Sequence, residues 1–291
     1  VEREGIKYNL VICGLLGGHS GTEIDKYHGN ANLIMGRLLH TIGKIVRFDL
    51  ISLNGGLQDN AIPREAKAEI LLDPSDAPAL EDAVTSFEDV MKNEYRMIEP
   101  NITIYCEDMG DDKARVLTPK TKERAIFLLM TLPDGIEKMS LDSANLVQTS
   151  SNAGIMRLNK ENFEVCISIR SSVSSEKIAL SDRIQYLTET IGGRFIAGSD
   201  YPAWEYKQKS ELRDLITETY KMTMGRNPII TGIHAGLEVG IFFEKIEDLD
   251  AVAIGPQVYD IHTPKERLSI SSYERVYKLL LRVLENSGKA S

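Results

Sequence analysis

Near its N-terminus the chain reads Lys7-Tyr8-Asn9-Leu10-Val11-Ile12-Cys13-Gly14-Leu15, an alternation of apolar and polar side chains that is typical of a half-buried β-strand. A glycine-rich bend follows at residues 17–21. From residue 24 to residue 42 the apolar side chains recur at helical spacing. This part of the sequence therefore predicts a strand, a tight turn and a helix.

The same unit continues with further alternating and helical segments. The patterns predict strands at residues 45–53, 64–72 and 101–106, and a helix at residues 77–95. Together with the first strand and helix, this gives the order β-α-β-β-α-β. That order is typical of a split βαβ, or ferredoxin-like, layer.

A second β-rich unit is predicted between residues 120 and 200. Its expected helices and strands are a helix at 120–131, strands at 144–150, 153–158 and 163–170, a helix at 176–190 and a strand at 194–197. We therefore expect two fused β-rich units within residues 1–200.

The pattern changes after Tyr201-Pro202. Strands expected at residues 229–233 and 251–254 alternate with helices, the last of them at residues 272–284, and this alternation is typical of α/β proteins. The predicted fold class is thus α+β followed by α/β, with one domain at residues 1–200 and another at residues 201–291.

Composition excludes several classes of protein. The net charge is −9 and no run of lysine or arginine occurs, which argues against a nucleic-acid partner. Cys13, Cys106 and Cys166 are too few and too scattered for a disulfide framework. No apolar stretch has the length of a membrane span and no signal-peptide pattern opens the chain, so we expect a cytoplasmic protein.

Short motifs along the chain resemble the aminoacyl-histidine dipeptidases (Xaa-His dipeptidases, peptidase D), which are dinuclear zinc peptidases related to the carnosinases. The motifs that carry the resemblance include Gly17-Gly18-His19-Ser20-Gly21, Asn60-Ala61-Ile62-Pro63, Ile169-Arg170-Ser171, His234-Ala235-Gly236-Leu237-Glu238, and Gly255-Pro256 with His262-Thr263-Pro264. Each motif alone is weak, but together they run in the expected order over nearly the whole chain.

The resemblance implies a ferredoxin-like lid and dimerisation domain followed by the C-terminal part of a zinc-peptidase α/β catalytic domain. The first catalytic half of such enzymes carries an H-x-D pair, a Glu-Glu pair and a further Asp. Here none of the 5 histidines is followed two residues later by aspartate, and no Glu-Glu dipeptide occurs. We therefore expect this chain to begin at the lid and to lack most of the metal ligands and the general base.

The resemblance also implies roles for single residues. His262 is expected to bind metal, with two Zn²⁺ per complete site and Co²⁺ or Mn²⁺ as alternatives, although a loop histidine that caps a turn explains it as well. His19 is expected to polarise the scissile carbonyl of the partner subunit's substrate; the alternative is a glycine turn with an incidental histidine.

The remaining candidates are expected to bind substrate. Arg170 suits the terminal carboxylate of a dipeptide, or else an ion pair at the surface. Asn60 suits a substrate contact or an Asx-turn. His234, Gly236 and Glu238 are expected to line the pocket, with a half-buried structural histidine as the alternative for His234.

The predicted function is metal-dependent hydrolysis of Xaa-His dipeptides, carnosine-like ones included, by a full-length homodimeric enzyme. This chain is expected to be inactive alone, with a dipeptide as ligand and neither nucleic acid nor membrane as partner. Two alternatives stay open: a non-catalytic dimerisation or binding module, and a related metal-dependent amidohydrolase or deacylase.

Overall fold

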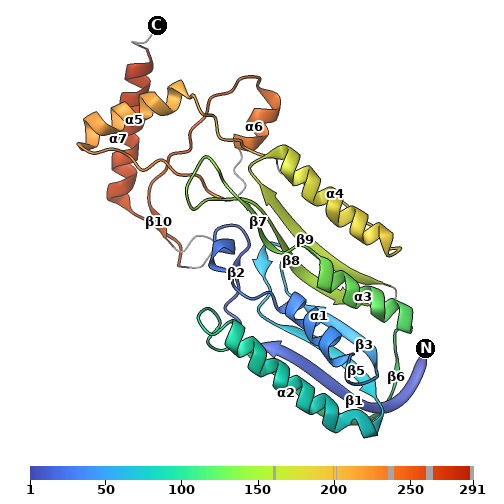
Figure 1. Ribbon diagram of the computed structural model, residues 1–291. Coiled ribbons are helices and arrows are strands. Elements are labelled where there is room, and N and C mark those ends of the chain that lie inside the picture. The colour runs from blue at the N-terminus through green and yellow to red at the C-terminus, as the bar shows by residue number, and fades with distance from the viewer. Residues whose placement is uncertain (160–161, 199, 201, 235–238, 260–264, 289–291) are drawn as a thin grey trace. The chain divides into compact units, whose positions relative to one another are not determined.

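The computed structural model describes residues 1–159, 162–198, 200, 202–234, 239–259 and 265–288 (Figure 1). The chain forms two compact units. The first comprises Val1–Asp200 with Ile233–Ala235, and the second comprises Tyr201–Gly232 with Gly236–Ser291.

The first unit begins with a strand-helix-strand-strand-helix-strand order. Its elements are β1 (Glu2–Cys13), α1 (Ala31–Ile42), β3 (Phe48–Gly55), β5 (Ala66–Leu72), α2 (Ala77–Glu94) and β6 (Thr103–Arg115). The strands pair antiparallel in the order β6-β1-β5-β3. Strands that are neighbours in the sheet are therefore not always neighbours in sequence.

Helix α1 begins later than its apolar pattern predicts. Asn30 caps it, because the Asn30 side chain accepts hydrogen bonds from the backbone N–H groups of Asn32 and Leu33. The preceding Ile24–Lys26 forms only a 3₁₀ turn. The first seven residues of the predicted helix, 24–30, therefore lie outside α1. They belong to the segment between β1 and α1, which also contains His19.

The same sheet continues into the second half of this unit. Strand β3 pairs with β8 (Val147–Leu158) at Asn54↔Arg157 and Gly55↔Met156, and β8 also pairs with β7 (Gly135–Met139) and β9 (Phe163–Ser171). The two predicted β-rich units therefore share one seven-stranded sheet.

The predicted elements of this half need three corrections. The two short strands expected at 144–150 and 153–158 are one strand, β8, because its polar residues are buried rather than placed in a turn. Strand β7 was not predicted, and no strand forms at 194–197. Helices α3 (Pro119–Thr131) and α4 (Ser174–Thr190) lie close to their expected bounds.

The core lies between the sheet and its helices. Helix α1 contacts both α2 and α3 on one face of the sheet, as Figure 1 shows. Met35, Leu38 and Leu39 of α1 are completely buried there. A smaller cluster lies beneath α4, where Leu180 and Ile184 pack with Leu132 and with the side chains of β9. Burial of these apolar surfaces supplies most of the stability of the unit.

Asp134 is an acidic group enclosed in this packing, at the junction of α3 and β7. Its Oδ1 accepts hydrogen bonds from Asn30 Nδ2 at 2.8 Å and from the backbone N–H of Ala153 at 2.9 Å. Burial raises the pKa of Asp134 to about 6, although both hydrogen bonds act in the opposite direction. The residue as a whole keeps some exposure, but its carboxyl group is enclosed.

The substitution Asp134→Asn should therefore stabilise the protein at alkaline pH. Because the folded state raises this pKa from 3.8 to about 6, it favours the protonated form, and that stabilisation is lost as the pH rises through 6. Asparagine keeps an oxygen acceptor without the charge. We expect the free energy of unfolding to rise by about 1–2 kcal/mol at pH 8 and to change little at pH 4.

Urea unfolding of both proteins at the two pH values checks this expectation. Asp89→Asn, at an exposed position of α2, serves as the matched control and should show no such pH dependence. Equal stability of Asp134→Asn and the unchanged protein at pH 8 would contradict the assigned cause.

The second unit is mainly helical in its described residues. It contains α5 (Glu211–Met224), α6 (Val239–Lys245), the short strands β10 (Val258–Tyr259) and β11 (Arg267–Leu268), and α7 (Ile270–Ser287). Helices α5 and α7 pack together through buried Thr219, Leu279 and Val283. Asn286 Nδ2 donates a hydrogen bond to Thr219 Oγ1 across this contact.

The strands expected at residues 229–233 and 251–254 are wrong, because these described residues form no regular structure. A strand needs a neighbour for its backbone hydrogen bonds, and the described residues place none beside these segments. Their apolar side chains stay partly in solvent: Ile229 is 92% exposed and Ile254 is 41% exposed.

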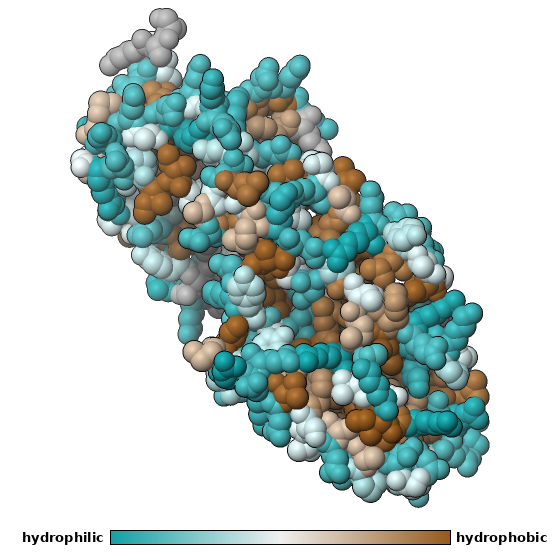
Figure 2. All heavy atoms as spheres, viewed as in Figure 1, coloured by the Kyte–Doolittle hydropathy of each residue, from teal (hydrophilic) through white to brown (hydrophobic). Residues whose placement is uncertain are grey.

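Helix α7 carries apolar side chains on more than its packed face. The exposed ones include Tyr273, Tyr277, Leu280 and Leu284. Hydrophobic residues also occur as patches among hydrophilic ones on the face drawn in Figure 2. None of the helices in the described ranges is long and apolar enough to cross a bilayer.

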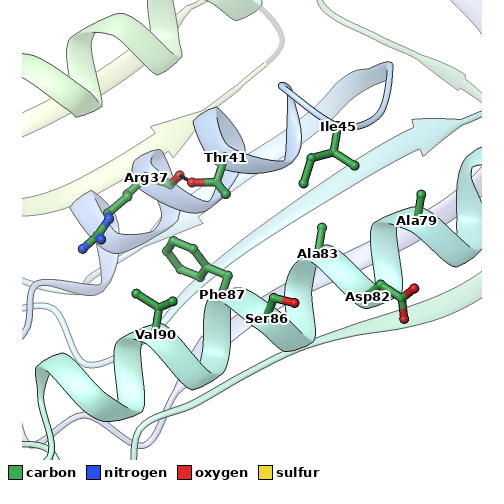
Figure 3. A pocket seen from close by; sticks show the side chains of 9 residues that line it. All are labelled: Arg37, Thr41, Ile45, Ala79, Asp82, Ala83, Ser86, Phe87 and Val90. Carbon is green, nitrogen blue, oxygen red and sulfur yellow. Dashed lines mark hydrogen bonds between the residues drawn. The ribbon is translucent and has the colours of Figure 1, made fainter.

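A groove with a volume of about 510 Å³ lies between α1 and α2 (Figure 3). Side chains from the two helices and the turn after α1 line it, among them Arg37, Ile45, Phe87 and Val90. Arg37 is already paired, since its two terminal nitrogens bind Glu94. None of the residues predicted to form a functional site lines this groove.

Candidate functional site

The His19 loop, residues 16–29, connects β1 to α1. Its short strand β2 (Gly18–His19) pairs with β4 (Ala61–Ile62), so that His19 lies opposite Ala61. Gly17 and Gly18 adopt φ angles of 66° and 142°, which residues other than glycine rarely adopt. Glycine at these two positions therefore has a backbone reason, whatever His19 does.

Hydrogen bonds hold the His19 ring in one tautomer. Its Nδ1 accepts from the backbone N–H groups of Gly21 and Thr22, each at 3.1 Å. An acceptor nitrogen carries no proton, so the neutral ring must carry its proton on Nε2. The backbone N–H of His19 is held in turn by Glu23 Oε2 at 2.8 Å. The loop thus presents His19 as a hydrogen-bond donor through Nε2.

The Asn60 segment is attached to the same place. The Asn60 carbonyl accepts from the backbone N–H of Ser20 at 2.9 Å. Asn152 of β8 donates through Nδ2 to the carbonyls of Asp59 and Ala61, at 2.9 and 3.0 Å. Hydrogen bonds therefore hold the backbone on both sides of Asn60, while the Asn60 side chain is exposed.

Arg170 lies near the end of β9, opposite Ser150 of β8. Its Nε is buried and has no hydrogen-bond partner among the described residues. Burial lowers the pKa of the guanidinium, and the negative charge of Asp59 only partly offsets this. The predicted alternative, a surface ion pair, finds no support in the described residues, where no carboxylate forms a salt bridge with Arg170.

His234, which is distant in sequence from both the His19 loop and β9, also lies at this site. It is 9% exposed, and its Nε2 lies 2.7 Å from Ser150 Oγ. Opposed residues of an antiparallel pair project to the same face of a sheet, so Ser150 and Arg170 share the face that His234 contacts. The His234 carbonyl packs on Gly21, where an added Cβ would lie 2.4 Å away.

The His234 ring is neutral at physiological pH. Its pKa is lowered to about 4, first by burial and second by the positive charge of Arg170, against a smaller opposing effect of the Val147 backbone. The site thus combines a half-buried guanidinium, a neutral imidazole and an Nε2–H donor. Such an arrangement favours an anionic, hydrogen-bond-accepting ligand.

The structure brings together His19, Asn60, Arg170 and His234 of the predicted residues. Gly236, Glu238 and His262 lie outside the described residues. Ser150 and Asp59 were missed by sequence reasoning. The run Thr149-Ser150-Ser151-Asn152 is polar and spans the end of the strand predicted at 144–150, and in the structure all four residues are buried.

The described residues do not fit a metal centre. Within these parts of the chain, no group of three or more His, Cys, Asp or Glu side chains is placed to hold a metal ion. Of the predicted histidines, His19 directs Nδ1 to backbone N–H groups and His234 directs Nε2 to Ser150.

Part of the first unit is similar to a known protein family. Residues 12–99, from the end of β1 past the end of α2, match the peptidase dimerisation domain family. The matched segment lies within the first compact unit. It contains His19, Asn60 and the groove between α1 and α2.

The resemblance inferred from the motifs is confirmed over nearly the whole chain. The chain is 34% identical over 278 residues to a cytosol non-specific dipeptidase of Escherichia coli (strain K12), covering 96% of this chain and 57% of the relative. It superposes on the crystal structure of an aminoacylhistidine dipeptidase from Vibrio alginolyticus with a TM-score of 0.90 and 31% identity, covering 97% of this chain and 57% of that one. The chain thus spans a little over half the length of these two dipeptidases.

Proposed function

We propose that this chain provides the substrate-recognising part of a metallopeptidase that hydrolyses Xaa-His dipeptides, β-alanyl-histidine among them. The observation that carries the proposal is the half-buried Arg170 guanidinium, whose buried Nε lacks a hydrogen-bond partner among the described residues, next to neutral His234 and the His19 loop. A dipeptide offers a carboxylate to the guanidinium and a carbonyl oxygen to an imidazole N–H donor.

Each side chain has a separate part in this proposal. Arg170 binds the C-terminal carboxylate of the dipeptide through its planar fork of donors. His19 donates its Nε2 hydrogen to the carbonyl oxygen that becomes negative as the peptide bond is attacked. Asn60 contacts the substrate from the paired segment. His234 is hydrogen-bonded to Ser150, and this contact holds His234 at the site.

The domain roles belong to the same proposal. Val1–Asp200 acts as a ferredoxin-like lid and dimerisation domain, and residues 201–291 as the C-terminal part of a zinc-peptidase catalytic domain. The match to a peptidase dimerisation domain supports a homodimer. The exposed apolar side chains of α7 support further packing partners for the second unit in a longer enzyme. The name of the Escherichia coli relative supports a cytoplasmic location.

The metal remains a prediction about a longer enzyme. Zn²⁺, Co²⁺ or Mn²⁺ with His262 as one ligand was expected, but the described residues do not form a ligand set. The roles proposed here therefore rest only on binding and hydrogen bonding by the side chains of this chain.

The test compares this chain with a protein that spans the full length of its relatives. We expect the longer protein to hydrolyse β-alanyl-histidine faster than dipeptides without histidine. We expect this chain alone to show no hydrolysis, with or without added Zn²⁺, because one histidine ligand cannot hold a catalytic metal. Chromatography of the released amino acids measures the hydrolysis of each dipeptide.

Three outcomes separate the candidate functions. Hydrolysis by this chain alone that stops on chelation would show that the predicted inactivity is wrong. Equal rates on histidine-free dipeptides would replace Xaa-His specificity by the broader activity named for the Escherichia coli relative. No hydrolysis by the longer protein would favour the dimerisation or binding module.

A further inference from the structure

Glu99 is a buried acidic residue to which no motif drew attention. It lies in the turn after α2 and is only 1% exposed. Its Oε2 accepts the backbone N–H of Leu16 at 2.7 Å, and its Oε1 accepts the backbone N–H of Gly29 at 2.9 Å. Leu16 and Gly29 are the two ends of the His19 loop, so one carboxylate joins them.

The chemistry of this contact requires a carboxylate. A buried carboxylate is costly unless its oxygens are hydrogen-bonded, and here each oxygen accepts one backbone N–H. Both groups that it binds are donors. The amide of glutamine offers only one oxygen and would turn its NH₂ toward the other N–H, leaving two donors face to face.

The chain around Glu99 is closely packed against the start of the loop. Gly14, two residues before Leu16, has a φ of +79°, and a Cβ there would lie 2.0 Å from the Asn101 carbonyl oxygen. Only glycine allows this approach of β1 to the turn that contains Glu99. The position of the carboxylate relative to the loop is thus set by backbone contacts.

A series of hydrogen bonds leads from the clamped ends to the His19 ring. Next to Gly29, the His28 ring binds the Gly17 carbonyl through Nδ1. Glu23 then holds the backbone N–H of His19, and Gly21 and Thr22 hold Nδ1. The contact between His28 and Gly17 joins the two sides of the loop, so it needs the loop ends to stay together, and the local contacts of His19 lie between these two sides.

We propose that Glu99 is a positioning residue that clamps both ends of the His19 loop and thereby holds His19 in its Nε2–H tautomer. Glu99 acts through backbone groups and not on a ligand. That the held tautomer serves catalysis rests on the proposed function; that Glu99 holds it does not.

The test is Glu99→Gln in this chain, with Glu94→Gln as the matched control. Glu94 is the last residue of α2, the helix that precedes Glu99, and it pairs with Arg37 at the surface. Ring ¹⁵N chemical shifts at pH 8 report the tautomer, with the His19 signals assigned from His19→Gln. The unchanged chain and Glu94→Gln should show His19 with an unprotonated Nδ1 and a protonated Nε2. In Glu99→Gln the two shifts should move toward each other as both tautomers become populated, while those of His40 stay unchanged.

A second measurement does not depend on any variant. In the unchanged chain, the amide hydrogens of Leu16 and Gly29 should exchange with solvent at least 100-fold more slowly than in an unstructured peptide. Fast exchange of both amides would overturn the clamp even if Glu99→Gln fails to fold. Unaltered His19 shifts in a folded Glu99→Gln protein would overturn it as well.

Activity of a longer dipeptidase gives a separate readout. There Glu99→Gln should lower kcat and leave KM nearly unchanged, because the substrate carboxylate is bound elsewhere. If His19 proves to have no catalytic part, the proposed function fails while the ¹⁵N shifts still change. If the shifts do not change, the clamp fails while the proposed function stands.

Discussion

Replacing His19 by alanine is expected to lower kcat for β-alanyl-histidine by about 10²–10³-fold in a dipeptidase of full length, the usual effect of removing one donor to a developing oxyanion. The reason is geometric: the Gly21 and Thr22 N–H groups occupy Nδ1, which leaves Nε2–H as the donor. KM should change much less, since this bond strengthens only as the carbonyl oxygen becomes negative. Steady-state kinetics of both proteins measures the two constants.

Two further variants make this expectation specific. His19→Gln retains an N–H donor and should recover part of the lost kcat. His40→Ala removes an exposed histidine near the end of α1 and should leave both constants unchanged. A loss of bound metal in His19→Ala, or a fall in kcat of less than about 3-fold, below the cost of one hydrogen bond, would show that His19 has another role.

Replacing Arg170 by methionine is expected to raise KM for β-alanyl-histidine by about 10–100-fold, the equivalent of losing a hydrogen bond to a charged group. The same substitution should keep or increase the free energy of unfolding. Burial lowers the pKa of this guanidinium, and its Nε has no hydrogen-bond partner among the described residues, so methionine removes a half-buried charge that the fold does not fully compensate. Kinetics and urea unfolding provide the two readouts.

The control for Arg170 is Arg157→Met, at an exposed position of the neighbouring strand β8. It should change neither KM nor stability. A substrate whose C-terminal carboxylate is converted to an amide should bind the unchanged protein and Arg170→Met equally weakly. If Arg170→Met destabilises the fold and leaves KM unchanged, then Arg170 belongs to a structural ion pair.

The regular elements of the first unit could be predicted closely because their causes are local. Periods of two and of 3.6 residues placed β1, β5, α2 and α4 near their observed bounds. The start of α1 could not be found in this way. The apolar pattern extends back to residue 24, whereas the Asn30 cap makes the helix begin at Ala31.

The candidate site was predicted unevenly, for a similar reason. His19 and Arg170 stand in motifs, and so they were found by resemblance. Ser150 and Asp59 stand in no motif, and their importance comes from the register that sets Ser150 opposite Arg170 and from the charge that Asp59 directs at the guanidinium. Neither relation can be read from spacing along the chain.

By itself the amino-acid sequence determined the order of strands and helices in residues 1–200, the glycine turn around His19 and the likeness to dipeptidases, because each depends on residues close together in the chain. Only the tertiary structure decided that residues 229–233 and 251–254 are not strands, since a strand forms only where another strand accepts its hydrogen bonds. It also decided that His234 reaches Ser150 and that Glu99 joins both ends of the His19 loop. Those contacts join residues 70 to 84 positions apart in the chain, and no local pattern records them.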